Sequence, residues 1–334
     1  MWRRRDGPLK PRDIQIAGRT HSFFPAPMAF TDPLLRMARG NGRISRLVGR
    51  FVRRWYGLPF DPLHYYSPLP DISGLKQRLD RWHHEDKSPG TDWNVDGQVA
   101  LAESLARFGD AASALPSLDS VTAQGFGPGY GAVEARVLYL MLRHFRPAHV
   151  IEVGSGVSSV FTLAGLDANQ ASGSARATLT CIEPYPREPL RALAATGRIT
   201  LDAREVQDVD FTRFEQLGPN DVLFIDSSHV SKKDSDVDFL VLEVFPRLRP
   251  GVVVHIHDIP FPLPALPATH PLFDASILWN EAALVKAFLL FNSAYEVLMC
   301  QSQLHFVRPD ALKRMAPSYD PAKEFPASLW LRRM

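Results

Sequence analysis

The sequence has few cysteines and no long apolar run, and these two absences narrow the classes of protein to which it can belong. Its 334 residues include only two cysteines, Cys181 and Cys300, which lie far apart within apolar segments. Such cysteines are typical of buried thiols in a reducing compartment, so we expect a cytoplasmic protein without disulfides. No apolar run reaches the roughly 18 residues that would predict a membrane-spanning helix.

A basic bias is also missing from most of the chain. Residues 1–56 hold 13 Lys and Arg against 3 Asp and Glu, so the net charge of +2 conceals an acidic remainder. Because the basic residues are confined to this leader, we expect no nucleic-acid partner. Apolar residues and arginines alternate at helical spacing over residues 43–56, which predicts an amphipathic helix. Such a helix either contacts a membrane surface or a protein, or packs on its own domain.

The rest of the chain divides into three segments. Residues 57–128 are rich in Pro, Trp and polar turns, and we expect a cap with helices at 75–84 and 97–108. Residues 129–310 alternate strand and helix patterns, and residues 311–334 are expected to pack on this domain as a tail. Regular alternation predicts an α/β fold, a doubly wound parallel sheet with helices on both faces. The oligomeric state stays open, a homodimer included.

The alternating segment predicts seven strands and the helices that connect them. The strands are expected at 149–153, 177–183, 199–206, 221–226, 252–257, 295–300 and 304–307, and the helices at 132–145, 158–169, 188–196, 210–216, 236–248 and 280–291. The last two strands are predicted to pair across a short turn, so one of them must run antiparallel. Ligands of such sheets bind at the carboxyl ends of the strands, which is where functional residues should gather.

A glycine turn follows the first strand and is the first candidate binding element. Its glycines let the backbone approach a ligand closely, and the next helix offers unpaired N–H groups. An acid at the end of the second strand, Glu183, is placed to accept hydrogen bonds from ribose hydroxyls. Asp208, after the third strand, either contacts an adenine edge or caps the next helix. The candidate cofactor residues are Glu152, Gly154, Ser155, Gly156, Ser158, Glu183 and Asp208.

Histidines and acids follow the fourth and fifth strands. Asp226 and His229 come after the fourth strand, and His257 and Asp258 after the fifth. Two histidines and two acids at adjacent strand ends favour a catalytic role over a structural one. In one scheme His229 or His257 is the general base on a hydroxyl or amine, and a carboxylate fixes its tautomer.

Four motifs together resemble class I S-adenosylmethionine-dependent methyltransferases, in the bacterial small-molecule branch that includes catechol O-methyltransferase-like folds. They are Glu-Val-Gly-Ser-Gly at 152–156, Cys-Ile-Glu-Pro-Tyr-Pro at 181–186, Phe-Ile-Asp-Ser-Ser-His at 224–229 and Val-His-Ile-His-Asp at 254–258. The resemblance implies a Rossmann-like sheet in the order 3-2-1-4-5-7-6 with strand 7 antiparallel. It also implies that S-adenosylmethionine (SAM) is the cofactor.

The resemblance assigns roles to individual positions of this chain. Glu152, Gly154 and Gly156 would line the methionine part of the cofactor and Glu183 its ribose, while Ser158 replaces the family's third glycine. Asp226, His257 and Asp258 occupy the positions from which such enzymes bind a divalent cation. In this second scheme Mg²⁺, Mn²⁺ or Fe²⁺ would activate a substrate hydroxyl. The scheme departs from the family because His257 is not an oxygen ligand.

The function expected from these features is SAM-dependent methyl transfer to a hydroxyl, or less readily an amine, of a small molecule. Two alternatives belong to other classes. The first is a degenerate methyltransferase fold that serves as a binding or scaffold module. The second is a metal-dependent, oxygenase-like relative that uses the His/Asp cluster to hold iron. Metal content and consumption of the cofactor distinguish the three.

Overall fold

The computed structural model describes residues 89–261 and 279–334, together with eight residues nearer the N-terminus. These eight are Leu47, Arg50, Phe51, Arg54, Trp55, Leu75, Gln77 and Arg78. Most residues of the two helices predicted at 43–56 and 75–84 therefore lie outside the described residues. The chain forms two compact units, Met1–Trp82 and His83–Met334, and the fold below is that of the second unit. The domain boundaries predicted at 56, 128 and 310 stay predictions.

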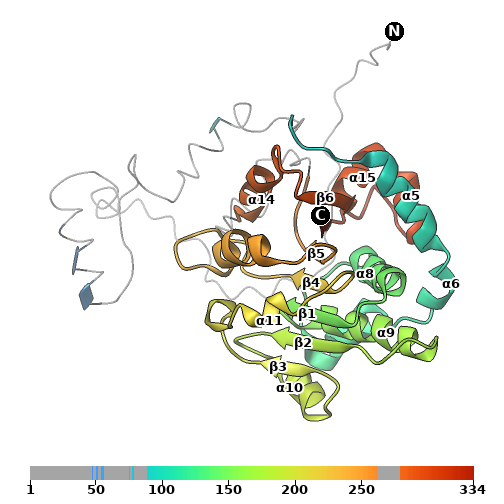
Figure 1. Cartoon of the computed structure of the whole chain (residues 1–334), viewed down its shortest axis with the longest axis horizontal. Helices are drawn as coiled ribbons and strands as arrows, with labels where there is room; N and C mark the ends of the chain where they lie inside the picture. Colours follow the sequence, from blue (N-terminus) through green and yellow to red (C-terminus); the bar gives the residue numbers. More distant parts are fainter. Residues whose placement is uncertain are drawn as a thin grey trace, which may run out of the picture. The chain divides into compact units, whose positions relative to one another are not determined.

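A seven-stranded sheet forms the centre of this unit (Figure 1). Its order is β3-β2-β1-β4-β5-β7-β6, which confirms the predicted topology. The strands are β1 (His149–Val153), β2 (Thr178–Ile182), β3 (Thr200–Asp202), β4 (Val222–Ile225), β5 (Val253–Ile256), β6 (Tyr295–Cys300) and β7 (Leu329–Arg333). Strands β1 to β5 are parallel, and β7 runs antiparallel to both of its neighbours.

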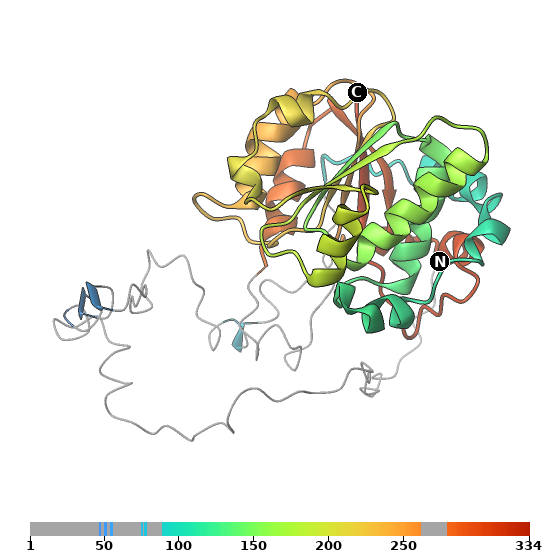
Figure 2. The same cartoon turned by 90° about the horizontal axis from the view of Figure 1, so that it is seen from below.

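Helices cover both faces of the sheet, as Figure 2 shows from a second direction. One face packs against α5 (Val95–Ala106), α8 (Ala132–Phe145), α9 (Val157–Ala171), α10 (Glu188–Ala195) and α16 (Pro309–Met315). The other packs against α11 (Thr212–Glu215), α14 (Glu281–Leu289) and a helical run of α12 (Asp236–Asp238), η3 (Phe239–Val244) and η4 (Phe245–Arg247). Because β1, β4 and β5 are apolar and covered on both sides, their carboxyl ends are fixed relative to one another.

The segment before α8 contributes to the α8 face rather than to the sheet. Helix α5 matches the helix predicted at 97–108 and is followed by α6 (Gly109–Ala112), α7 (Leu118–Val121) and η1 (Thr122–Phe126). The buried Leu105 of α5 belongs to the same apolar cluster as Leu138 of α8. This packing brings the loop after η1 to the carboxyl edge of the sheet.

Two predicted strands differ from the structure. The third strand was expected at 199–206 but ends at Asp202, because Arg204 turns back to form two hydrogen bonds with the Asp202 carboxylate at 2.8 and 2.7 Å. The strand predicted at 304–307 is wrong, since residues Gln301–Val307 form helix α15.

The true partner of β6 is β7, which lies in the segment predicted to be a tail. Two helices, α15 and α16, separate β6 from β7 in the chain, so no short turn joins the closing strands. The apolar run at 304–307 is too short to distinguish strand from helix by its periodicity. Within it Leu304 is fully buried, whereas Phe306 and Val307 are half exposed.

Candidate active site

The turn after β1 is held against the end of β4 by backbone contacts that only glycine permits. Gly154 has φ +81°, and a Cβ atom added there would lie 1.7 Å from the backbone oxygen of Asp226. Its N–H donates to the backbone oxygen of Ile182 at 3.0 Å, which ties the turn to β2 as well. A left-handed φ without space for a side chain explains the first glycine of the motif.

A cleft of about 290 Å³ opens at this turn. Its lining residues are Phe126, Gly127, Pro128, Gly154, Ser155, Gly156, Val157, Ser158, Glu183, Tyr185, Arg187 and Asp226. Five of the seven predicted cofactor residues are among them. The backbone N–H groups at the start of α9 and the glycines give this cleft the features of a nucleotide-cofactor site.

Glu183 forms the acidic wall of the cleft, at the carboxyl end of β2. One of its carboxylate oxygens accepts a hydrogen bond from the Tyr185 N–H at 2.8 Å. Partial burial raises the pKa of this carboxyl, although the hydrogen bond from Tyr185 opposes the shift. A fixed carboxylate that borders the cleft is suited to accept hydrogen bonds from ribose hydroxyls.

Two of the predicted cofactor residues do not line the cleft. Glu152 is fully buried beneath the turn, and its carboxylate accepts hydrogen bonds from three hydroxyls of α9. Asp208 is exposed on η2 (Val206–Asp208) and its backbone oxygen accepts a hydrogen bond from Arg204. Neither residue lines this cleft, and the cofactor-binding roles of Glu152 and Asp208 stay predictions. Strand alternation turns the Glu152 side chain toward α9, where its three hydrogen-bond partners lie.

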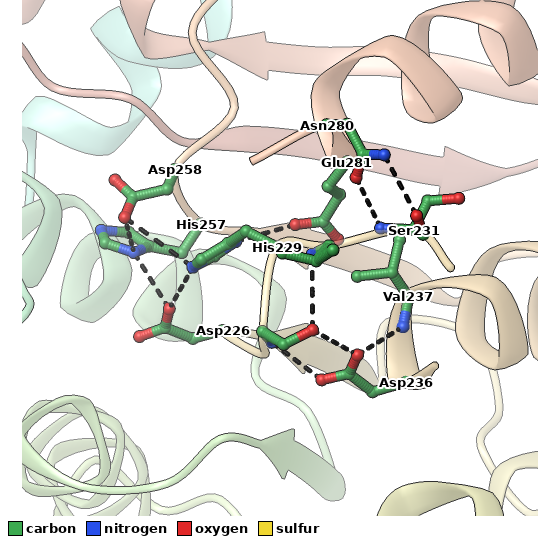
Figure 3. A network of polar contacts seen from close by, with 11 residues as sticks. Asp226, His229, Ser231, Asp236, Val237, His257, Asp258, Asn280 and Glu281 are labelled. Carbon is green, nitrogen blue, oxygen red and sulfur yellow. Dashed lines mark hydrogen bonds and ion pairs between the residues drawn. The ribbon is translucent and has the colours of Figure 1, made fainter. Parts of the chain in front are cut away.

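The predicted His/Asp cluster is brought together at the ends of β4 and β5, directly beside the cleft (Figure 3). The Asp226 Oδ1 atom lies 3.4 Å from His229 Nε2 and 3.3 Å from His257 Nδ1, so it faces both imidazoles. Asp258 Oδ2 lies 3.8 Å from His229 Nε2 and 3.6 Å from His257 Nδ1. All four side chains therefore meet in one group, and Asp226 also borders the cofactor cleft.

A fifth residue, Glu281, completes the cluster and was not among the predicted site residues. Its Oε2 atom lies 2.8 Å from Nδ1 of His229, and its side chain is almost fully buried. The N–H groups of Asn280 and Glu281 donate to the backbone oxygen of His229 at 3.0 and 3.2 Å. The start of α14 thus holds both the backbone and the ring of His229 (Figure 3). The only sequence signal was an acid in the first turn of a helix, which is common at helix starts.

The backbone of the cluster is itself unusual. His229 and Asp258 adopt left-handed conformations with φ +57° and +54°. Such conformations are costly for residues other than glycine, and they gather at functional sites that the surrounding structure over-determines. Here they turn both side chains back toward Asp226 immediately after their strands end.

The pKa values of the residues in the cluster are shifted in different directions. Burial alone would raise the pKa of Asp226, but hydrogen bonds from His229 and His257 outweigh it and lower that pKa to about 2. Burial would lower the pKa of His229, but its hydrogen bonds to Asp226 and Glu281 raise the pKa to about 10. Burial raises the pKa of Asp258, against the attraction of the two histidines. Near neutral pH His229 is therefore a cation, and Asp258 is a better proton acceptor than an ordinary aspartate.

Two aromatic rings flank the histidines. The ring of Tyr130 is buried with its centroid 4.6 Å from that of His257. Trp279 is half exposed, and its ring centroid lies 4.6 Å from that of His229. Trp279 therefore offers an apolar surface to solvent at the edge of the cluster, whereas Tyr130 closes its inner side.

The metal site predicted from Asp226, His257 and Asp258 has no support in the geometry. Within residues 89–261 and 279–334, no group of three or more His, Cys, Asp or Glu is arranged to hold a metal ion. The imidazole Nδ1 of His257 instead faces carboxylate oxygens of both acids at ion-pair distance.

No helix among the described residues is long and apolar enough to cross a membrane.

Comparison of this chain with known proteins finds one matching sequence family and several solved structures with similar folds. Residues 151–259 match a family model described as a methyltransferase domain. This match spans β1 to β5 and so includes the glycine turn, Glu183 and the His/Asp cluster. An uncharacterised protein of Archaeoglobus fulgidus is 29% identical over 180 residues, which cover 52% of this chain and 80% of that protein.

Solved structures with similar folds include two O-methyltransferases. TomG from Streptomyces achromogenes, involved in tomaymycin synthesis and solved with SAM, has 15% identity and a TM-score of 0.39, covering 78% of this chain and 96% of TomG. An enzyme from Bacillus cereus, solved with S-adenosylhomocysteine (SAH), has 13% identity and a TM-score of 0.37, covering 79% of this chain and all of that one. At these identities the similarity concerns the fold alone.

Proposed function

We propose, from the match of residues 151–259 to a methyltransferase domain, that the chain transfers the methyl group of SAM to a hydroxyl oxygen of a small molecule. The observation that carries this proposal is the position of Asp226. Asp226 lines the cofactor cleft, and its carboxylate pairs with His229 and His257. An acceptor bound at the cluster would therefore lie next to the cofactor.

The cleft would hold SAM by an acidic side chain at one end and by the glycine turn at the other. Glu183 would accept hydrogen bonds from the ribose hydroxyls, and the turn at Gly154 and Gly156 would pack against the methionine part. When bound, the sulfonium supplies an electrophilic methyl group, so the protein needs to orient the acceptor, exclude water and remove one proton.

The pKa values favour a division of labour within the cluster. His229, held as an imidazolium by Glu281 and Asp226, would stabilise the negative charge that develops on the acceptor oxygen. Asp258, whose pKa is raised by burial, would take the proton. This assigns the general base to an aspartate rather than to a histidine, because a histidine with a pKa near 10 already carries its proton at neutral pH.

The same charges favour a hydroxyl over an amine. An oxygen acceptor becomes negative as it loses its proton, and an imidazolium stabilises that charge. An amine acceptor becomes positive as it receives the methyl group, and the same imidazolium opposes it. Trp279 would provide an apolar wall for the body of the acceptor.

The first experiment is calorimetric titration of the full chain with SAM, followed by a screen of phenols, aliphatic alcohols and amines for SAH formation. We expect micromolar binding of SAM that Glu183→Ala weakens, and turnover with hydroxyl acceptors. Cys300→Ser provides a matched control because Cys300 is buried on β6, away from the cleft.

Chelation distinguishes the metal-assisted scheme. Activity that survives a chelator and dialysis supports proton transfer by the cluster alone. Activity that is lost and then restored by Mg²⁺, Mn²⁺ or Fe²⁺ would contradict that assignment and favour a metal-activated hydroxyl. Absence of SAM binding under every condition would contradict the enzyme function and favour a scaffold role.

A further inference from the structure

Glu152 carries a buried carboxylate whose partners are hydroxyl groups. Its Oε1 atom accepts hydrogen bonds from Ser158 and Ser159 at 2.7 Å each, and its Oε2 atom accepts one from Thr162 at 3.1 Å. Within residues 89–261 and 279–334, no ion pair with a Lys, Arg or His reaches this carboxylate. A buried anion without a cation is costly, so a nearby positive charge would relieve it.

The cofactor cleft lies immediately above this carboxylate. Glu152 precedes Gly154 by two residues, and the Ser158 side chain that donates to Glu152 belongs to a residue that lines the cleft. One serine therefore separates the carboxylate from the space that SAM would occupy. SAM brings a positively charged sulfonium to this space, whereas its product SAH carries a neutral sulfide.

We propose that Glu152 makes binding in the cleft proton-linked and selective for the charged cofactor: it releases a proton to solvent when SAM binds and regains one when SAH replaces SAM. This rests on the methyltransferase function proposed above. Glu152 acts as a positioning residue, because it reaches the cofactor through Ser158 and the turn rather than by contact. As a consequence, the cleft binds SAH more weakly than SAM.

The groups that face Glu152 keep a constant charge near neutral pH. Burial raises the pKa of Cys181, its neighbour on β2, to about 12, and holds the pKa of Tyr130 well above its usual value. The histidines keep Asp226, beyond β4, ionised with a pKa of about 2. Helix α9 presents only hydroxyls. Burial raises the pKa of Glu152 itself to about 7, against the three hydroxyl hydrogen bonds. Burial also raises the pKa of Glu183 in the cleft wall, so the Thr162→Val variant is what assigns the titration to Glu152.

The direction of the effect follows from linkage. A bound sulfonium favours the ionised carboxylate and lowers the pKa of Glu152, so SAM affinity should rise as pH increases toward the pKa of the free protein, about 7, and then level off. Each unit by which the sulfonium lowers the pKa adds about tenfold to the change in affinity. SAH, without the positive charge, should show a much smaller change.

The test is calorimetric titration of the full chain with SAM and with SAH from about pH 5.5 to 8.5, in buffers of different ionisation enthalpy. At pH 7 we expect release of about half a proton with SAM and little with SAH. Thr162→Val removes one hydrogen bond that lowers the pKa of Glu152, and should move the SAM profile to higher pH. Glu152→Gln should flatten it and reduce the preference for SAM over SAH.

Thr180→Val is the matched control. Thr180 is also a buried threonine, but it lies on β2 in register with Ile151, so its side chain points to the face opposite Glu152 and Cys181. The pH profile of SAM affinity in the Thr180→Val variant should match that of the unmodified protein. Because Thr162→Val changes one hydroxyl, it keeps the test valid even where Glu152→Gln unfolds the protein.

The outcomes separate this inference from the function on which it rests. Equal pH profiles for SAM and SAH, or a profile that Thr162→Val leaves unmoved, would overturn the role of Glu152 while the methyltransferase function stands. Failure of the unmodified protein to bind either molecule would instead overturn the function.

Discussion

The two halves of the sheet's carboxyl edge build their sites by different means. At β1 and β2 the cleft is built around a glycine turn whose backbone lies against that of Asp226, with Glu183 and Arg187 as charged residues of its lining. At β4 and β5 the cluster consists of charged side chains that pair with one another. The first half tolerates little change in shape, and the second little change in charge. Substitutions in the first half should therefore reduce stability and SAM binding, and substitutions in the second half should reduce turnover.

The largest effect is expected at the glycine turn. Gly154→Ala places a Cβ 1.7 Å from the backbone oxygen of Asp226 in a left-handed conformation. We expect a loss of roughly 3–5 kcal/mol in the free energy of unfolding, from overpacking and φ strain together, with loss of SAM binding. Denaturant unfolding and calorimetry measure the two effects. Gly173→Ala, with φ +91° and nothing within 4 Å, should cost only about 1–2 kcal/mol. Equal costs would contradict the role of close contact.

The charged half should lose turnover rather than stability. Asp258→Asn removes the proposed proton acceptor, and His229→Ala removes the charge that stabilises the acceptor oxygen. Each should lower kcat by about 10²–10⁴-fold and leave the affinity for SAM nearly unchanged. His149→Ala is the control, because His149 is also paired with an aspartate, Asp221, at the opposite ends of β1 and β4. A parallel loss of SAM affinity would show that the two halves are not separable.

Glu281→Gln should change the pH dependence of turnover measured at saturating SAM. Activity needs Asp258 ionised and His229 protonated, so it should rise through the raised pKa of Asp258 and fall near pH 10, where His229 loses its proton. Removing the Glu281 charge lowers the pKa of His229 and moves the falling limb to lower pH. A shift of one unit would reduce the rate about tenfold on that limb. An unmoved limb would exclude His229 as the group that titrates there.

The smallest effect is expected at the exposed edge of the cluster. Trp279→Ala removes a half-exposed ring that contacts His229. We expect KM for the acceptor to rise by about 2–10-fold with kcat unchanged, as for the loss of one stacking surface. Trp279→Phe should restore most of the affinity. A fall in kcat without a change in KM would instead show that Trp279 positions His229.

The same contrast explains how much of the molecule could be predicted from its sequence. The glycine turn was predictable because its sequence signal is local: both glycines directly follow a β-branched run within five residues, although the atom that leaves no space at Gly154 belongs to Asp226. The strand order followed from the family resemblance. Glu281 was not predictable, because it meets His229 across 52 residues of sequence and sits in an ordinary helix start. The hydroxyl partners of Glu152 were not predictable for a related reason, since they lie on the next helix rather than in the turn.

The position of β7 has a consequence for how the chain reaches this structure. Strand β7 follows every other strand of the sheet in the chain, yet it lies between β5 and β6. During synthesis β6 emerges before the strand that joins it to the rest of the sheet, and the edge that pairs with β7 stays unpaired until residues 329–333 have left the ribosome. Strands β1 to β5 can assemble while the chain is still being made, whereas the sheet beyond β5 is completed only by a strand that inserts last.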